Sequence, residues 1–284
     1  MSINEIYEYY SEYSDESFLE ILCRSETEPV INGIHMPGFP SVDFQVHSVG
    51  SAGSATLRNE GQAFYKVVKD SSNSFGSSVS GAKILDFGCG WGRMIRFFFK
   101  DTESKNIYGV DVDPKMISIC KETLHYGNYS VVNPHPPTDF PDMTFDIIFA
   151  YSVFSHLRDD VAEKWIIEFS RILKNDGILV ATTEGLLFLN KCEYLHLNPD
   201  KQDHAWHRII ANCFSSVEET RNKYLNGEFI YAATGGGETR DSSFYGEAVV
   251  PKAYIENNWG KYLRFRDFFE DQRKFSQSVF IMQK

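Results

Sequence analysis

The chain has 284 residues, of which 42% are hydrophobic and 24% charged, and its formal net charge is −11. This length and composition are those of a globular protein that can bury a sizeable core. The negative balance argues against a nucleic-acid partner, because phosphate binding needs a basic surface.

The cysteines and the N-terminal residues indicate the cellular compartment in which the protein is expected. The five cysteines are widely spaced and form no Cys-x-x-Cys pair. We therefore expect reduced thiols and a cytoplasmic setting, not a disulfide framework or a zinc site. The first residues are polar and acidic and lack the apolar core of a signal peptide. No apolar run approaches the roughly 18 residues that cross a bilayer, so we expect a soluble protein without a membrane span.

The first 80 residues are predicted to form a helical extension or cap. Apolar residues at helical spacing predict helices within residues 1–24. The segment 25–53, with three prolines and several glycines, is predicted to be irregular. A helix is expected from its cap Thr56 to about Asp70, followed by a serine-rich linker over 71–80.

The stretch from Lys83 to Lys100 organises the rest of the chain. It predicts a short buried strand over 84–87, a loop with three glycines, and then an amphipathic helix. Such a turn places backbone N–H groups and a helix N-terminus beside a ligand, which only glycine lets approach closely. The glycines are 88, 90 and 92, and the acid Asp86 stands at the mouth of the strand.

The spacing of these glycines distinguishes two cofactor classes. Dinucleotide sites use Gly-x-Gly-x-x-Gly, whose third glycine lets helix and strand pack closely. Here the third glycine, Gly92, comes one residue early, and position 93 is Arg. A nicotinamide oxidoreductase is therefore disfavoured, although it stays open as a rival interpretation.

Strands and helices alternate from residue 83 to 183, which predicts a parallel sheet covered on both faces. Asp111 ends the second strand, 19 residues after Gly92, where an acid can accept hydrogen bonds from two ribose hydroxyls. Asp113 and Pro114 begin one helix as cap and first position, and Asp160 is expected to begin another with a capping box. Further strands are expected at 106–111, 129–133, 145–150 and 178–183.

The C-terminal third is predicted to contain a substrate-site insert over residues 184–245. Within it we expect a helix capped by Ser215, a strand over 229–233 and a flexible turn at the three glycines 235–237. Two strands, at 262–269 and 278–282, are expected to follow the insert.

Four motifs, in order along about a hundred residues, resemble those of class I S-adenosylmethionine-dependent methyltransferases. They read Asp86-Phe-Gly-Cys-Gly-Trp-Gly-Arg, Gly109-Val-Asp-Val-Asp, Phe145-Asp-Ile-Ile-Phe-Ala-Tyr-Ser and Leu173-Lys-Asn-Asp-Gly-Ile-Leu. The resemblance includes the Gly-Cys-Gly-Trp-Gly-Arg variety of the first motif. It implies an α/β, Rossmann-like, doubly wound fold, with a mainly parallel seven-stranded sheet whose last strand is antiparallel. It also implies S-adenosylmethionine as cofactor and S-adenosylhomocysteine as product.

The resemblance also implies roles for single residues. Asp86 is expected to help hold the ammonium group of the cofactor, and Asn133 stands near the adenine contact, where the family often has an acid. Ala150 and Tyr151 are expected to line the methionine and substrate side. The other predicted cofactor-binding residues are Gly88, Cys89, Gly90, Gly92, Arg93, Asp111 and Val112. Arg93 makes sense in the first turn of a helix if it meets an anion such as the cofactor carboxylate.

A sulfonium methyl group is already activated, so such an enzyme must mainly align nucleophile, methyl carbon and sulfur. A phenol or alcohol acceptor benefits from a base, and His156 is the best placed; its alternative role is a structural hydrogen bond. His204 and His207 could be a base or a metal pair, but cap packing is favoured and no metal is expected.

We therefore predict a methyltransferase with a cap over residues 1–80 and a methyltransferase domain over 81–284. The acceptor is expected to be a small molecule or a sugar or glycan, methylated on oxygen. The alternative, from another class, is a catalytically inactive S-adenosylmethionine-binding sensor or partner protein.

Overall fold

The structure is a computed structural model, which describes residues 5–271 and 273–284. The chain divides into two compact units. The first unit contains the chain up to residue 132 with segments 140–149 and 173–178; the second contains 133–139, 150–172 and 179–284. The predicted boundaries of the cap, the methyltransferase domain and the insert stay predictions.

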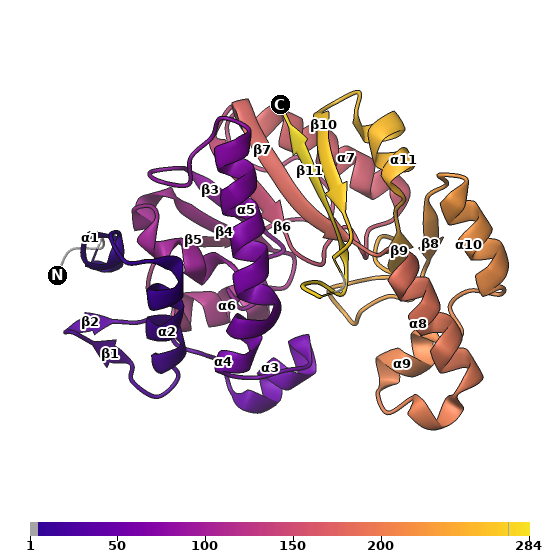
Figure 1. Ribbon diagram of the computed structural model, residues 1–284, viewed down its shortest axis with the longest axis horizontal. Coiled ribbons are helices and arrows are strands. Elements are labelled where there is room, and N and C mark those ends of the chain that lie inside the picture. Colours follow the sequence, from indigo (N-terminus) through magenta and orange to yellow (C-terminus); the bar gives the residue numbers. More distant parts are fainter. Residues whose placement is uncertain (1–4, 272) are drawn as a thin grey trace. The chain divides into compact units, whose positions relative to one another are not determined.

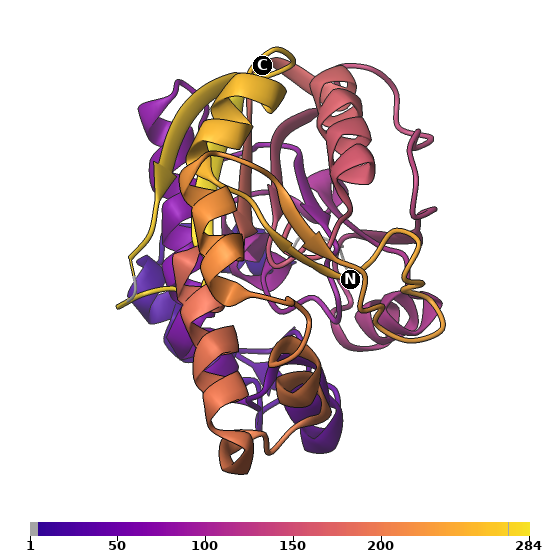
Figure 2. The same ribbon diagram turned by 90° about the vertical axis from the view of Figure 1, so that its right-hand side faces the viewer.

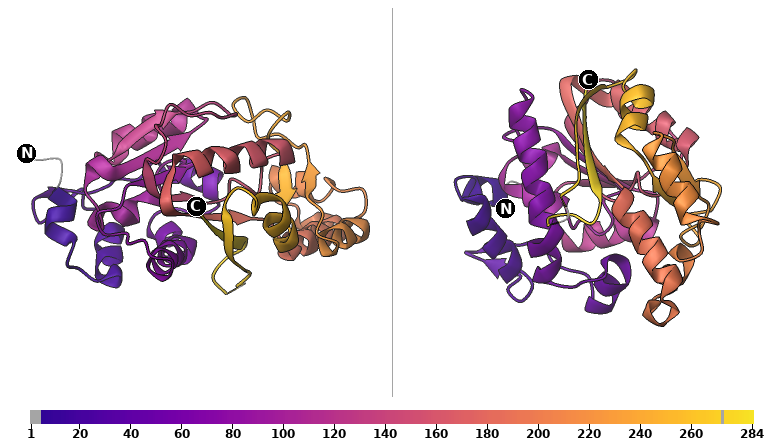
Figure 3. Two further views of the ribbon diagram at one scale, coloured as in Figure 1. Left: turned by 90° about the horizontal axis from the view of Figure 1, so that it is seen from above. Right: turned by 45° about the vertical axis from the view of Figure 1, so that its right-hand side comes forward.

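Seven strands form one sheet in the order β10-β11-β7-β6-β3-β4-β5 (Figure 1). β3 pairs in parallel with β4 and with β6, and β4 pairs in parallel with β5. β10 and β11, yellow in Figure 3, pair with each other antiparallel. The predicted doubly wound α/β sheet with an antiparallel end is thus confirmed. The strands are β3 Ile84–Phe87, β4 Ile107–Asp111, β5 Asn128–Val131, β6 Phe145–Ala150, β7 Leu173–Thr183, β10 Arg264–Phe269 and β11 Ser278–Gln283.

The central strands are apolar along their whole length because they are buried on both faces. All four residues of β3 are buried, and in β6 only one residue of six is not fully buried. On one face of the sheet, Phe64 of helix α5 and Phe98 pack against Phe149 of β6, with ring centroids 6.0 and 5.1 Å away. β3 and β4 pair in parallel and in register, so their carboxyl ends lie at a common edge of the sheet.

The helical elements of the first unit lie mostly before and between its strands. Ser14 caps α2 by accepting a hydrogen bond from the Ser17 N–H. Asp113 caps α6 with Pro114 at its first position, and this cap was predicted. The elements are α1 Glu5–Tyr10, α2 Asp15–Arg24, α3 Val42–Val49, α4 Ser54–Thr56, α5 Gln62–Ser74, α6 Pro114–Thr123, the π-helix η1 Leu57–Gly61, and the 3-10 helices η2 Ile95–Lys100 and η3 Ser104–Asn106.

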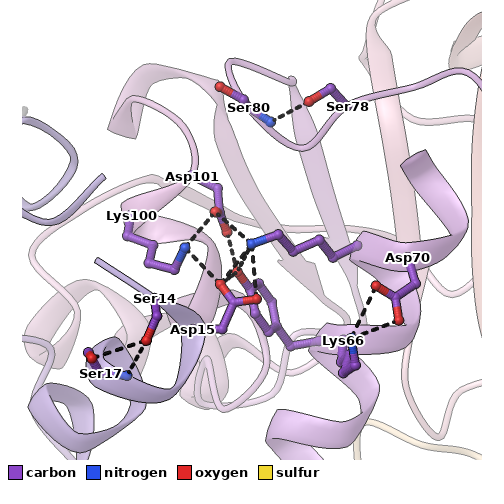
Figure 4. A network of polar contacts seen from close by, with 11 residues as sticks. Ser14, Asp15, Ser17, Lys66, Asp70, Ser78, Ser80, Lys100 and Asp101 are labelled. Carbon is purple, nitrogen blue, oxygen red and sulfur yellow. Dashed lines mark hydrogen bonds and ion pairs between the residues drawn. The ribbon is translucent and has the colours of Figure 1, made fainter. Parts of the chain in front are cut away.

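A network of paired charges docks α2 in the first unit (Figure 4). Asp15 of α2 accepts from Lys69 at 2.7 Å and from Lys100 at 2.8 Å. Lys100 also reaches Asp101 at 3.0 Å, and the hydroxyl of Tyr65 lies 2.7 Å from Asp101. Each of these four charges has a partner of opposite sign, so the network explains how α2 is held.

Three expectations for the N-terminal part are corrected. Thr56 does not cap a helix, because α4, η1 and α5 follow one another from 54 to 74. The residues 71–74 therefore belong to α5, and the linker is shorter than predicted. The segment 25–53 is not irregular throughout: it contains α3 and a hairpin of β1 Val30–Ile31 and β2 Ile34–His35. Its turn, Asn32-Gly33, has positive φ at both residues, which is a hairpin signal the sequence analysis passed over.

Two further expectations concern helices. Helices are confirmed within 5–24, whereas residues 1–4 of the predicted helical segment lie outside the described residues. After the glycine turn the chain forms the 3-10 helix η2 instead of an amphipathic α-helix. All six residues of η2 are buried, so no polar stripe faces solvent.

The second unit contains the helices that follow β6 and β7. α8 packs on α9 and α10, and α10 also contacts β8 (Figure 2). Leu189, Cys192 and Ile210 are among the buried residues of their common core. The elements are α7 Asp159–Ile172, α8 Leu186–Leu197, η4 Pro199–Lys201, α9 Ala205–Ile210, α10 Val217–Leu225, β8 Ile230–Ala232, β9 Glu247–Val249, α11 Lys252–Tyr254 and η5 Ile255–Trp259.

Corrections in the second half of the chain are local. Asp160 lies inside the first turn of α7 and binds Arg158, so it forms no capping box. Ser216, not Ser215, caps α10 by accepting from the Glu219 N–H. β7 begins at Leu173 and not at residue 178. The short strand β9, which pairs with β8, was not expected.

Candidate functional site

The glycine turn after β3 is fixed to the neighbouring strand by its own backbone. The N–H groups of Gly88 and Cys89 both donate to the carbonyl oxygen of Val110, at 2.8 and 3.0 Å. The next N–H, of Gly90, donates to Oδ2 of Asp111 at 2.9 Å. The predicted glycine turn and the predicted strand-end acid therefore meet directly.

Gly90 and Gly92 have different structural roles. Gly90 has a φ of 52°, and a Cβ atom built on it would meet nothing within 4 Å. The backbone there is open to the approach of a ligand. Gly92 has a φ of 81°, and its Cβ would lie 2.3 Å from Cδ1 of Leu124. This third glycine is required for packing against the segment that follows α6.

Asp86 is a buried carboxylate whose surroundings fit a cation. It is only 1% exposed, and its Oδ2 has no hydrogen-bond partner in the described part of the chain. Burial and the nearby carboxylate of Asp111 raise the pKa of Asp86 well above its usual range, whereas Arg93 lowers it. A buried carboxylate oxygen without a partner is costly, and a bound group that donates a hydrogen bond would offset this cost. An ammonium group would supply the missing partner.

Asp111, the last residue of β4, is the second acid beside the glycine turn. Its Oδ1 accepts from the N–H of Asp113 and its Oδ2 from that of Gly90, both at 2.9 Å. These bonds fix the orientation of the carboxylate. Two further predicted residues are partly buried: Val112 directly follows Asp111, and Arg93 directly follows Gly92.

The remaining predicted cofactor residues lie in the second unit. Asn133 is exposed and stands two residues after the end of β5. Ala150 is the buried last residue of β6, next to Phe149, which pairs in register with Asp86. Tyr151 follows and is half-buried. Their contacts with a cofactor stay predictions.

His156 is held by the backbone at one nitrogen. Its Nδ1 lies 2.8 Å from the carbonyl oxygen of Gly246, so Nδ1 carries the proton and Nε2 keeps a lone pair. The ring stacks on Tyr245 at 4.6 Å, and the side chain is 18% exposed. Burial lowers the pKa of His156 to about 4, which keeps the imidazole neutral at physiological pH.

Glu247, in β9, is a residue that the sequence analysis missed. It is 3% exposed, and its Oε1 accepts from the indole N–H of Trp206 at 2.8 Å. Its Oε2 has no hydrogen-bond partner among the described residues and lies 3.7 Å from Nδ1 of His156. Burial raises the pKa of Glu247 to about 7, while Trp206 and Lys191 act to lower it. No motif surrounds Glu247 in the sequence, so only its burial identifies it.

A second missed group is a hydrogen-bonded network around Gln277. Its amide N–H₂ donates to Ser152 and to Glu184, each at 3.0 Å, and its carbonyl accepts from Thr182 at 2.5 Å. Ser152 follows β6 with a φ of 59°, a conformation that a serine adopts only when its surroundings impose it. These residues are far apart in the sequence, and no local pattern links them.

The remaining predictions concern a metal site, the cysteines and membrane-spanning helices. The rings of His204 and His207 lie 5.3 Å apart, and no group of three or more potential metal ligands occurs among the described residues. All five cysteines are free thiols. Within residues 5–271 and 273–284, no helix has the length and apolar character needed to cross a membrane.

Comparisons with known proteins bear on residues 85–181, which match a family model described as a methyltransferase domain. An uncharacterised methyltransferase of Schizosaccharomyces pombe is 30% identical over 122 residues, covering 39% of this chain and 42% of that protein. The chain spans about half the length of the curated relatives it matches.

Two solved structures share the fold. An S-adenosylmethionine-dependent methyltransferase from Clostridium acetobutylicum has a TM-score of 0.54 and 13% identity, covering 85% of this chain and 96% of the other. Magnesium protoporphyrin IX methyltransferase from Synechocystis, solved with bound S-adenosylhomocysteine, has a TM-score of 0.50 and 12% identity, covering 85% and 92%. The family match shows that residues 85–181 resemble a methyltransferase domain, and the two solved structures show that the chain shares the fold of S-adenosylmethionine-dependent methyltransferases.

Proposed function

We propose that this chain is an S-adenosylmethionine-dependent methyltransferase that methylates an oxygen atom of a small molecule or a sugar. The observation that carries the proposal is the pair of buried acids at the glycine turn. Asp86 has an oxygen without a partner, and Asp111 is oriented by the backbone of Gly90. The backbone at Gly90 is open beside them.

Each residue of this edge has a task in the proposal. Asp86 binds an ammonium group, because a cation offsets the cost of its burial. Asp111 accepts hydrogen bonds from ribose hydroxyls, and the turn from Gly88 to Gly92 carries the backbone past the ligand. When bound, S-adenosylmethionine supplies a methyl group on a positively charged sulfur. The contacts of Asn133 with adenine and of Tyr151 with the methionine side belong to the same proposal.

On the acceptor side, His156 is proposed as the general base. Since Nδ1 donates to the carbonyl of Gly246, the lone pair of Nε2 can take a proton from a hydroxyl group. The carboxylate of Glu247, 3.7 Å from Nδ1, would stabilise the imidazolium that forms. The low pKa of His156 makes it a weak base in the ligand-free protein, so the ionised form of Glu247 is needed for efficient transfer.

An activity screen tests this function. The protein is incubated with S-adenosylmethionine and panels of phenols, sugars, carboxylic acids and amines, and S-adenosylhomocysteine is measured. We expect turnover with hydroxyl acceptors and a loss in kcat of about a hundredfold or more in His156→Ala. The matched control is His196→Ala, because His196 is also bonded through Nδ1 to a backbone carbonyl. Turnover only with amines, or an equal effect of both variants, would contradict O-methylation assisted by His156.

Two broader predictions accompany the proposal. The five free thiols are compatible with a cytoplasmic protein, and that setting stays a prediction. The formal net charge of −11 supports a small-molecule or glycan acceptor over a nucleic acid.

A further inference from the structure

Arg96 is a buried cation directly after the glycine turn, and the proposed function leaves it without a task. It is the fourth residue after Gly92 and is 0% exposed. Its guanidinium lies between two aromatic rings, 4.5 Å from the ring centre of Phe39 and 4.9 Å from that of Trp91. Stacking of this kind suits the flat guanidinium group and would be lost with lysine.

The guanidinium donates to two backbone carbonyls from different parts of the chain. Nε donates to the carbonyl oxygen of Gly92 at 3.0 Å, and Nη2 to that of Gly38 at 3.1 Å. The N–H of Gly38 in turn donates to the carbonyl oxygen of Thr123, at the end of α6, at 2.7 Å. Arg96 therefore connects the last glycine of the turn with the segment Gly38–Phe39. The N–H of Gly38 connects this segment with α6.

The charge of Arg96 is not balanced by a neighbouring carboxylate. In the described part of the chain no ion pair includes Arg96, and its Nη1 has no hydrogen-bond partner. Burial lowers the pKa of Arg96 to about 10, so the side chain stays charged at physiological pH. An unpaired buried charge is costly, and an apolar residue of similar size would make the core more stable. Packing alone therefore does not account for an arginine at this position.

We propose that Arg96 is a positioning residue for the cofactor turn. Its hydrogen bond to the carbonyl of Gly92 fixes the turn that begins at Gly88. Its hydrogen bond to the carbonyl of Gly38 links the conformation of this turn to the position of the segment Gly38–Phe39. The inference rests on the proposed function, because the ligand of the turn is S-adenosylmethionine. The N-terminal segment is thereby part of the cofactor-binding machinery, although Gly38 and Phe39 belong to none of the methyltransferase motifs.

Calorimetric titration with S-adenosylhomocysteine tests this role on Arg96→Met, Arg96→Lys and a control, Arg58→Met. Arg58 is a 44% exposed arginine that pairs with Glu20. We expect Arg96→Met to weaken binding by about tenfold or more, the effect of losing one charge-assisted hydrogen bond. Arg96→Lys should be intermediate, because lysine keeps the charge but not both bonds and the stacking. Arg58→Met should bind as the wild type does.

Hydrogen exchange provides a readout that a purely structural role would not change. In the wild type, S-adenosylhomocysteine should slow exchange in segment 36–40 as well as in the turn; in Arg96→Met only the turn should respond. A folded Arg96→Met variant with wild-type affinity and exchange would overturn the proposal. If that variant does not fold, Arg96→Lys and Phe39→Leu decide the matter, since both should weaken binding. A wild-type protein that does not bind S-adenosylhomocysteine would instead refute the proposed function.

Discussion

Replacing Glu247 by glutamine should make the protein more stable at alkaline pH. Glu247 is 3% exposed, and among the described residues only Trp206 donates a hydrogen bond to its carboxyl group, at 2.8 Å. Glutamine has nearly the same shape, can still accept from Trp206 at its oxygen, and cannot ionise. The variant therefore removes the cost of the buried charge and little else.

The size of the effect follows from the pKa of Glu247, which burial raises from 4.5 to about 7. Because each tenfold change in proton affinity corresponds to about 1.4 kcal/mol, ionisation of Glu247 should cost about 3 kcal/mol of folding stability. A carboxyl group with a raised pKa contributes its full stability below pH 4.5 and loses it as the pH rises through 7. The loss in the wild type should thus be complete by about pH 8.

His156 has the opposite dependence. Burial lowers its pKa from 6.5 to about 4, so its contribution is present above pH 6.5 and is lost as the pH falls toward 4. The two effects overlap between pH 4.5 and 6.5 and partly cancel in the wild type. Because both proteins contain His156, the difference in stability between Glu247→Gln and the wild type at each pH is the quantity to compare.

Urea unfolding at several pH values between 5 and 8.5 measures this difference. We expect Glu247→Gln to gain stability over the wild type as the pH rises, by about 2.5 kcal/mol between pH 5 and 8.5. The control is Glu228→Gln, which changes an exposed glutamate of the same unit and should show no such trend. A constant difference between Glu247→Gln and the wild type at all pH values would refute a buried, ionising carboxyl group at this position.

Two substitutions in the first unit test its packing and its polar network. Gly92→Ala should destabilise the fold by about 2 kcal/mol in urea unfolding, because its φ is 81° and the new Cβ would lie 2.3 Å from Leu124; an unchanged midpoint would contradict the close approach. Tyr65→Phe should cost about 1–2 kcal/mol, since the hydroxyl lies 2.7 Å from Asp101 and the phenylalanine cannot donate there. A wild-type melting temperature for Tyr65→Phe would show that the network does not need this hydroxyl.

Much of the sheet could be predicted because its signals are local. The buried strand over 84–87, the glycines and the cap Asp113 with Pro114 all act through neighbours in the sequence, and the structure has them where they were expected. The strand over 145–150 was also predicted with the bounds that it has.

The errors arose where long-range packing decides the local structure. The chain after Gly92 forms a 3-10 helix that is buried on all sides, which the periodicity of the sequence could not show. The pKa of Glu247 is raised by its burial in the folded chain, and Arg96 donates a hydrogen bond to the carbonyl of Gly38, which is 58 residues away. Such contacts depend on the fold as a whole, so no local sequence motif predicts them.

Calorimetric titration with S-adenosylmethionine, S-adenosylhomocysteine and NAD tests the central claim most directly. It is done on the wild type, on Asp111→Ala, and on Asp70→Ala as an exposed control. The account predicts saturable binding of the first two ligands, no binding of NAD, and a loss of about tenfold or more in affinity only in Asp111→Ala. Binding of NAD alone, or of none of the three by the folded protein, would contradict it.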